Sequence, residues 1–155
     1  MGSHVQIVPY KPEYATFFEQ LNKAWIQEHF IMEPVDYYVL ENPQEAILNK
    51  GGVILFALFE EKVIGTVALA YVRKGVFELT KMAVDERFRG IGAGRILCEA
   101  ALKKAADLNA NEVILYSNTK LTTAINLYRK IGFVELPLEH GLYDRADIKM
   151  GISMI

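Results

Sequence analysis

Three β-rich runs lie close together in the middle of the chain, at residues 53–59, 63–72 and 76–84. Only short polar turns separate them, at residues 60–62 and around Gly75. Runs joined by so few residues fold back on one another and pair antiparallel, because a parallel pair needs a much longer crossover. The middle of the chain is therefore predicted to form an antiparallel meander to which the other elements must attach.

Helical and strand patterns flank this meander and complete a single domain over residues 5–155. The pattern predicts the order β-α-α-β-β-β-α-β-α-β-β, an α/β (α+β mixed) fold with a mixed, mostly antiparallel sheet flanked by helices. The flanking elements are a strand at 5–8, a helix starting near Pro12 and reaching Trp25, an irregular to helical stretch at 31–50, a helix after Gly94, a strand at 113–117, a helix stopped by Gly132, and a strand through the alternating Ile148, Met150, Ile152 and Met154.

Composition narrows the classes of partner and compartment. The chain has 155 residues and a formal net charge of −2, which gives no reason to expect nucleic acid or an acidic membrane as a partner. The single cysteine, Cys98, rules out an internal disulfide and fits a reducing, cytoplasmic setting. The apolar runs are too short to span a bilayer. The three histidines, at positions 4, 29 and 140, have no metal-ligand spacing, so no metal is expected.

A glycine-rich segment, residues 89–94, lies directly between the third meander strand and the following helix. Gly90, Gly92 and Gly94 carry no Cβ, so a bulky anion can approach the backbone closely. The first N–H groups of the helix lack internal partners and point toward such an anion. Three nearby arginines add positive charge. The segment is therefore predicted to be a pyrophosphate cradle, the alternative being a flexible connection with scattered arginines at positions 87, 89 and 95.

Two common phosphate-binding patterns do not fit this segment. A nucleotide-hydrolase loop requires Lys and then Ser or Thr after its last glycine, whereas Arg95 and Ile96 follow Gly94. The dinucleotide fingerprint requires a third glycine where Arg95 stands. Its strand should also open a βαβ unit, whereas the strand here is the third of a meander.

The segment resembles the signature of the GNAT superfamily of N-acetyltransferases, which reads Arg or Gln, two residues, Gly, one residue, then Gly or Ala. It appears here as Arg89-x-x-Gly92-x-Gly94, and a second family motif appears as residues 124–133, Ala-Ile-Asn-Leu-Tyr-Arg-Lys-Ile-Gly-Phe. The resemblance covers nearly the whole chain. It implies that acetyl-CoA is the co-substrate and that its pyrophosphate lies on the backbone amides of Arg87, Arg89, Gly90, Ile91, Gly92, Ala93, Gly94 and Arg95.

The same resemblance suggests contacts further along the cofactor. In the family a bulged strand places a backbone N–H beside the thioester, which here corresponds to Met82, Ala83 and Val84. Many members carry Asn at the position of Leu121. Asn118, at the end of its strand, is the candidate to replace that polar contact.

Glu78 and Tyr128 are the candidate catalytic residues. Attack by an amine needs a base, because an alkyl ammonium has a pKa of about 10.4 and is mostly protonated at pH 7. Family members with Glu at the position of Glu78 use it as that base, here acting through bound water. Strict alternation would put Glu78, Thr80, Met82 and Val84 on one face. Tyr128 resembles the family tyrosine that protonates the leaving thiolate. The alternatives are a solvated carboxylate and a core tyrosine.

These observations predict an enzyme that moves an acetyl group from acetyl-CoA to a primary amine by direct attack. The acceptor is a small molecule or a peptide that the sequence does not identify. The alternative is a catalytically silent acyl-CoA-binding regulatory module that keeps the cradle. The oligomeric state is left open between a monomer and a homodimer.

Overall fold

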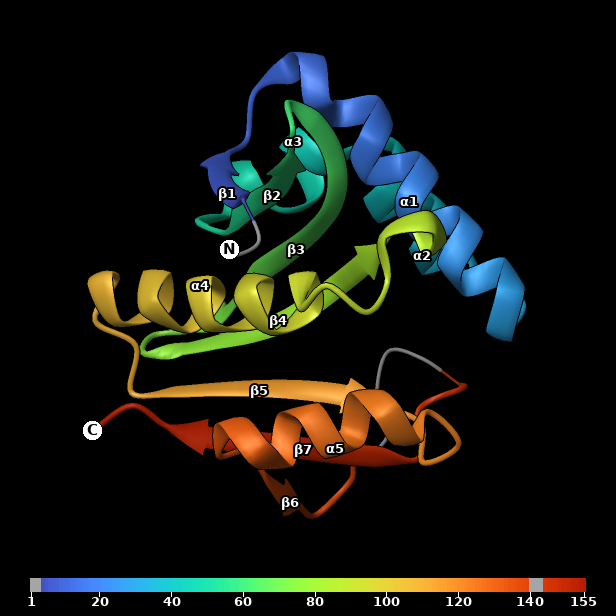
Figure 1. Cartoon of the computed structure of the whole chain (residues 1–155). Helices are drawn as coiled ribbons and strands as arrows, with labels where there is room; N and C mark the ends of the chain where they lie inside the picture. The colour runs from blue at the N-terminus through green and yellow to red at the C-terminus, as the bar shows by residue number, and fades with distance from the viewer. Residues whose placement is uncertain (1–3, 140–143) are drawn as a thin grey trace.

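The computed structural model describes residues 4–139 and 144–155 of the chain. Its elements follow the predicted order, with the stretch at 31–50 resolved into two short helices and a 3₁₀ turn (Figure 1). The strands are β1 (Val5–Pro9), β2 (Val53–Phe59), β3 (Lys62–Arg73), β4 (Val76–Val84), β5 (Glu112–Ser117), β6 (Val134–Leu136) and β7 (Ile148–Ser153). The helices are α1 (Ala15–His29), α2 (Pro34–Glu41), α3 (Pro43–Ala46), α4 (Ala93–Asp107) and α5 (Thr122–Ile131), with 3₁₀ turns at Pro12–Tyr14, Leu48–Lys50 and Glu86–Phe88.

All seven strands belong to one sheet in the order β1-β2-β3-β4-β5-β7-β6. Neighbouring strands pair antiparallel except for β4 and β5, which pair parallel. The meander β2-β3-β4 is confirmed, and so is the mixed, mostly antiparallel sheet. The parallel pair occurs where α4 provides the crossover between the two strands, as a parallel connection requires.

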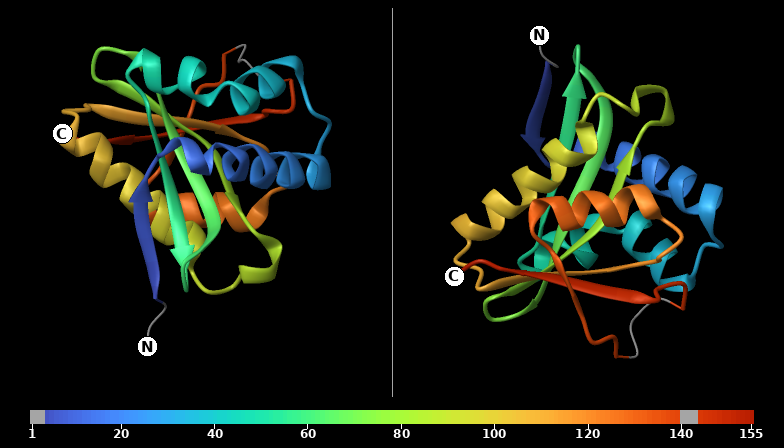
Figure 2. Two further views of the ribbon diagram at one scale, coloured as in Figure 1. Left: turned by 90° about the horizontal axis from the view of Figure 1, so that it is seen from above. Right: turned by 60° about the horizontal axis from the view of Figure 1, so that its bottom comes forward.

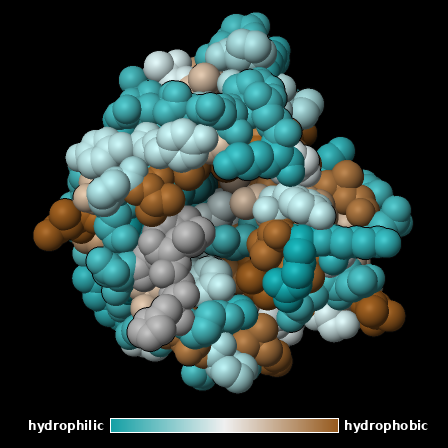
Figure 3. All heavy atoms as spheres, turned by 180° about the vertical axis from the view of Figure 1, so that it is seen from behind, coloured by the Kyte–Doolittle hydropathy of each residue, from teal (hydrophilic) through white to brown (hydrophobic). Residues whose placement is uncertain are grey.

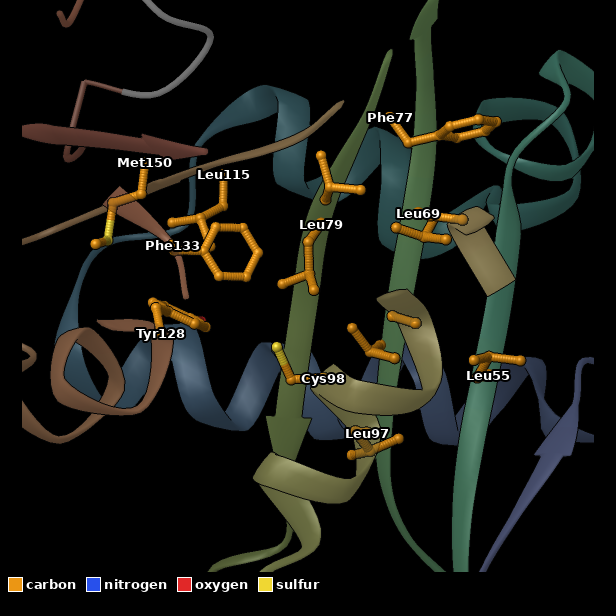
Figure 4. Packing of buried hydrophobic residues seen from close by; sticks show 14 of the residues in the cluster. Leu55, Leu69, Phe77, Leu79, Leu97, Cys98, Leu115, Tyr128, Phe133 and Met150 are labelled. Carbon is orange, nitrogen blue, oxygen red and sulfur yellow. The ribbon is translucent and has the colours of Figure 1, made fainter. Parts of the chain in front are cut away.

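Helices cover both faces of the sheet (Figure 2). On one face α4 and α5 pack through Leu97, Cys98 and Tyr128 onto the strands, and Figure 4 shows these side chains beside Leu79 and Phe133. On the other face α1 and α2 bury a second apolar cluster. Its members are Phe18, Ile26, Leu40, Ile47, Ile54, Phe56 and Ala68. The alternation of side chains along β2 supplies both clusters, so this central strand is apolar on both faces.

The surface seen from behind the view of Figure 1 carries apolar side chains in separate patches bordered by polar residues (Figure 3). Within residues 4–139 and 144–155, no helix combines the length and apolar character needed to cross a bilayer.

Candidate active site

The central feature of the sheet is a wedge between β4 and β5. The two strands pair only at their starts, and the last pair in register is Glu78 with Ile114. Beyond that point they diverge, as Figure 1 shows toward their C-terminal ends. Strands that separate leave backbone groups without ladder partners and make room between them for another molecule.

A pocket of about 90 Å³ fills this wedge, several times the volume that one water molecule needs. Its walls come from β4, the end of β5, α1, α5 and the segment before β7. The lining residues are Asn22, Trp25, Ile26, Phe30, Leu79, Thr80, Lys81, Met82, Tyr116, Ser117, Asn118, Leu121, Ala124, Tyr128, Arg145 and Ala146. Residues from four regions of the sequence, around α1, β4, the β5–α5 junction and the start of β7, therefore meet at one site.

A β-bulge interrupts β4 where it borders the pocket. Thr66 pairs with Ala83 and Ala68 pairs with Thr80, so Lys81 and Met82 together oppose the one residue between Thr66 and Ala68. Lys81 has the left-handed φ of 54°. A bulge leaves an extra backbone group without a ladder partner beside the pocket. The bulged strand that the resemblance implied is present.

The bulge also corrects the expected arrangement of side chains along β4. Met82 and Val84 pack against the cluster beneath α4 and α5, whereas Lys81 reaches α2 on the opposite face. The prediction that Glu78, Thr80, Met82 and Val84 share a face was wrong, because the extra residue reverses the alternation. Of the three predicted thioester contacts, Met82 lines the pocket and Ala83 and Val84 do not.

The glycine segment, where the pyrophosphate cradle is predicted, lies directly before the first turn of α4 and includes its first residues. Gly90 and Gly92 have φ values of 90° and 86°, and Gly92 immediately precedes the helix. A Cβ placed on either glycine would meet no atom within 4 Å, so the backbone is open on that side. The first intrahelical bond runs from the Ile96 N–H to the Gly92 carbonyl, which leaves the earlier N–H groups of the helix for a ligand. The exposed backbone fits a pyrophosphate.

The three arginines around the cradle are each paired with a carboxylate. Arg87 donates to Asp85, and its side chain is 78% exposed. Arg89 bonds to Glu28 of α1 at 3.2 Å, and Arg95 bonds to Glu99 one helical turn along. A pyrophosphate would compete with these carboxylates for each arginine. Two other residues of the predicted cradle differ in exposure. Ile91 is partly exposed, whereas the side chain of Ala93 is buried in the core.

Glu78 lies at the closed end of the wedge, with 7% of its surface exposed. Burial raises the pKa of its carboxyl to about 7, and the nearby Lys81 ammonium partly opposes that rise. The alternative of a solvated carboxylate is therefore excluded, because the fold buries this side chain. Its carboxyl does not line the pocket itself, whereas its neighbours Leu79 and Thr80 do.

Tyr128 lines the pocket from α5, with its ring edge against Phe133 at 5.8 Å between centroids. Burial raises the pKa of its phenol well above the usual value near 10. Among the described residues its hydroxyl has no hydrogen-bond partner, while every fully buried side-chain polar atom has one. The hydroxyl is therefore accessible from the pocket. Tyr128 belongs to the packed cluster that Figure 4 shows and also lines the pocket.

Asn118 is held by its own loop. Its Nδ2 donates to the Arg145 carbonyl at 2.7 Å, and its Oδ1 accepts from the Lys120 N–H at 2.9 Å. Leu121, which replaces the family Asn, lies in the same pocket wall. One amide hydrogen of Asn118 is left for a cofactor contact.

A buried ion network beside the pocket was missed by the sequence reasoning. Asp36 of α2 is fully buried and binds both Lys81 of the bulge and Arg145 before β7, at 3.1 Å and 2.7 Å. Nothing in the local sequence signals this network, because its members are 45 and 109 residues apart. Buried Lys and Asp side chains are rare in proteins. Here the opposite charge of each side chain stabilises the other, which explains why both are buried.

This fold and site define a class of proteins, the GNAT-type acetyltransferase fold. The crystal structure of a GNAT acetyltransferase from Staphylococcus aureus Mu50 superposes with a TM-score of 0.86 at 21% identity, covering 97% of this chain and 99% of that one. A putative acetyltransferase from Salmonella typhimurium, solved with acetyl-CoA, superposes with a TM-score of 0.79 at 17% identity over 99% and 95% of the two chains.

The sequence itself shows the family. The model of the Acetyltransferase (GNAT) family matches residues 15–133, and this chain belongs to that family. An N-alpha-acetyltransferase from Sulfurisphaera tokodaii is 38% identical over 49% of this chain and 46% of its own length. Human N-acetylaspartate synthetase is 30% identical over 68% of this chain and 33% of its own length. The matched region is thus less than half the length of either relative.

Proposed function

We propose that this protein transfers an acetyl group from acetyl-CoA to a primary amine by direct attack. The observation that carries the proposal is the pocket in the β4–β5 wedge. It is lined by the β4 bulge and by Tyr128, and the buried Glu78 directly precedes two of its lining residues on β4, the strand that leads to the glycine cradle. Family membership supports the acetyl-CoA part of the proposal, and the open backbone of Gly90 and Gly92 fits the pyrophosphate.

In the proposed reaction the amine nitrogen attacks the thioester carbonyl carbon and forms the new C–N bond. The carbonyl oxygen becomes an oxyanion, which a backbone N–H of the bulge at Lys81 and Met82 is proposed to stabilise. The C–S bond then breaks and the thiolate leaves. The proton lost by the nitrogen passes through water to Glu78, and the thiolate gains a proton from Tyr128 or from water. The products are an N-acetyl amide and the free thiol of coenzyme A.

Direct attack is favoured over an acetyl-enzyme intermediate. Cys98 is the only cysteine in the sequence, and it lies on the buried face of α4. Burial raises the pKa of its thiol to about 12, so the thiolate needed for nucleophilic attack is scarce. The acetyl group therefore passes to the amine in one displacement.

The raised pKa of Glu78 matches the task of a base. A carboxyl with a pKa of about 7 is substantially ionised at physiological pH and holds a proton far better than an ordinary carboxylate. The pKa of Glu78 is closer to that of an α-amino group, about 8, than to that of a lysine-like amine, about 10.4. The names of the two relatives point the same way, so peptides with a free α-amino group and aspartate are the first acceptors to test.

The test is a screen for release of free thiol from acetyl-CoA in the presence of candidate amines. The purified protein is assayed with peptides of different N-termini, free amino acids and a polyamine. We expect turnover with at least one α-amine and a matching acetylated product by mass spectrometry. Binding of acetyl-CoA without turnover of any amine would favour the silent regulatory module instead.

A further inference from the structure

The buried network around Asp36 joins three parts of the chain. The Asp36 carboxylate accepts hydrogen bonds from Arg145 at 2.7 and 2.9 Å, from the Lys81 ammonium at 3.1 Å and from the Glu33 N–H at 2.8 Å. Arg145 also reaches the Glu33 carboxylate at 3.1 Å. Taking any one of these charges out of water is costly, so each depends on its partners.

Lys81 has an unusual position within this network. Its backbone adopts the left-handed conformation in the bulge, and its side chain is 3% exposed. A non-glycine residue in that conformation stores strain that the surrounding structure must hold in place. Lys81 also lines the pocket, three residues after Glu78 on the same strand.

Lys81 has two buried carboxylates within its electrostatic reach, and the structure pairs it with one of them. The Lys81 ammonium donates a hydrogen bond to Asp36 at 3.1 Å, while its effect on the pKa of Glu78 is that of a nearby charge. A lysine paired directly with Glu78 would hold that carboxyl in its ionised form and weaken it as a base.

We propose that Asp36 is a positioning residue for acetyl transfer: it binds the Lys81 ammonium, keeps it from pairing with Glu78, and so leaves the Glu78 carboxyl free to take a proton. This inference depends on the proposed function for its effect on turnover. Its effect on the Glu78 carboxyl needs no acceptor and no turnover.

Several other charged groups surround Glu78 and must be considered. On β5 the Tyr116 phenol interacts electrostatically with Glu78, and its pKa is raised to about 12, so it stays neutral. Beyond Tyr116, Lys149 of β7 pairs with Glu139 at 3.0 Å. Arg73 of β3 also acts on the Tyr116 phenol, and within residues 4–139 and 144–155 the network itself contributes Asp36, Glu33, Lys81 and Arg145. Lys81 is the cation that acts on Glu78, so changes in its pairing should have the largest effect on the pKa of Glu78.

Two single variants should move the Glu78 titration in opposite directions. Lys81→Met removes the cation, so the midpoint should rise from about 7 by about one unit. Asp36→Asn releases Lys81 to Glu78, so the midpoint should fall by about one unit or more. Carbon-13 NMR of labelled glutamate carboxyls, assigned with Glu78→Gln, measures both. Lys23→Met, which removes a lysine that is paired with Glu19 and Glu41 and is not among the groups that shift the pKa of Glu78, is the matched control and should leave the midpoint unchanged.

Turnover supplies the second readout. In Asp36→Asn we expect kcat at pH 8 to fall by up to about tenfold while the Kd for coenzyme A stays within about twofold, because the base is weakened and the cradle is untouched. In Lys81→Met the acidic limb of the rate profile should shift to higher pH. Melting curves establish that each variant is folded.

The inference is overturned if Asp36→Asn raises the midpoint of the Glu78 titration or leaves it unchanged. Lys81→Met, in contrast, should raise that midpoint. If a single variant does not fold, the double variant Asp36→Asn/Lys81→Met decides. It has no ammonium to pair with Glu78, so its midpoint must lie at or above the wild-type value, and a fall would contradict the inference. If the wild-type protein acetylates no amine, the proposed function fails while the titration still decides this point.

Discussion

At the residue scale, burial affects the two candidate catalytic groups differently. It raises the pKa of Glu78 to about 7, which makes the carboxyl a better proton acceptor near neutral pH. It raises the pKa of Tyr128 further above that of a thiol, which makes the phenol a poorer proton donor to the thiolate. Glu78 is therefore expected to contribute more to turnover than Tyr128.

Changing Glu78 to Gln should lower kcat by about 10²-fold at pH 8 and leave coenzyme A binding intact. The wild-type rate should rise with pH through about 7 as the carboxyl ionises, and the variant should lack this rise. The difference should be greatest between pH 7 and the pKa of the acceptor, because below that window the base is itself protonated. Rate profiles from pH 5.5 to 10 measure this. A loss that is the same at every pH would assign Glu78 a positioning role.

Changing Tyr128 to Phe should slow turnover by only about tenfold or less. Proton transfer from a phenol with a raised pKa to a thiolate is uphill, and a thiolate can leave without a proton. The melting temperature should change little, because the ring keeps its contact with Phe133 and the hydroxyl has no partner to lose among the described residues. Steady-state kinetics with a good acceptor test the role. A variant as fast as the wild type would make Tyr128 a packing residue alone.

At the element scale, the junction between β4 and α4 combines two local irregularities. The bulge at Lys81 and Met82 reverses the faces of β4, and two left-handed glycines then turn the chain into α4. The bulge depends on contacts with α2 and the segment before β7, whereas the turn depends only on its own glycines. The two can therefore be disturbed separately.

Changing Gly92 to Val should reduce coenzyme A affinity at least about tenfold, equivalent to about 1.4 kcal/mol. The added side chain would fill the open side of the cradle, and a β-branched residue is strained at a φ of 86°. Isothermal titration calorimetry measures the change. The matched control is Gly94→Ala, which lies inside α4 and places its Cβ 3.9 Å from the nearest atom, so its affinity should stay within about threefold. Equal affinity in both variants would place the phosphates elsewhere.

At the scale of the whole molecule, the site exists only when both halves of the sheet are assembled around the wedge. Its pocket takes walls from α1, β4, β5, α5 and the segment before β7, and α4 follows β4 directly. An unfolded chain holds none of these together, so a cofactor that uses them should bind the native state alone and stabilise it by mass action.

Coenzyme A and acetyl-CoA at about 100 times their Kd should stabilise the native state by about 2.7 kcal/mol. For a domain of this size that corresponds to a rise of about 5–10 °C in Tm. NAD and ATP at the same concentration should raise it much less, because they lack the pantetheine arm of coenzyme A, which we expect to occupy the wedge. Differential scanning calorimetry provides the measurement. Equal rises in Tm with all of these ligands would indicate only a general phosphate-binding site at the start of α4.

The sequence by itself determined the features that depend on neighbouring residues. The meander, the order of elements, the glycine turn into α4 and the Gly132 stop of α5 follow from periodicity and from residues that tolerate left-handed backbone. These are local properties, so a short window of sequence carries them.

Only the tertiary structure decided the rest of the site. The bulge in β4, the burial of Glu78 and the pairing of Lys81 with Asp36 depend on side chains that are distant in sequence. Strict alternation failed at Met82 and Val84 because one extra residue in a strand exchanges its faces, and no local pattern marked that residue. The cost of burying charge can be met only by partners that the fold brings together, which is why the reactivity of Glu78 could not be predicted from its neighbours in the chain.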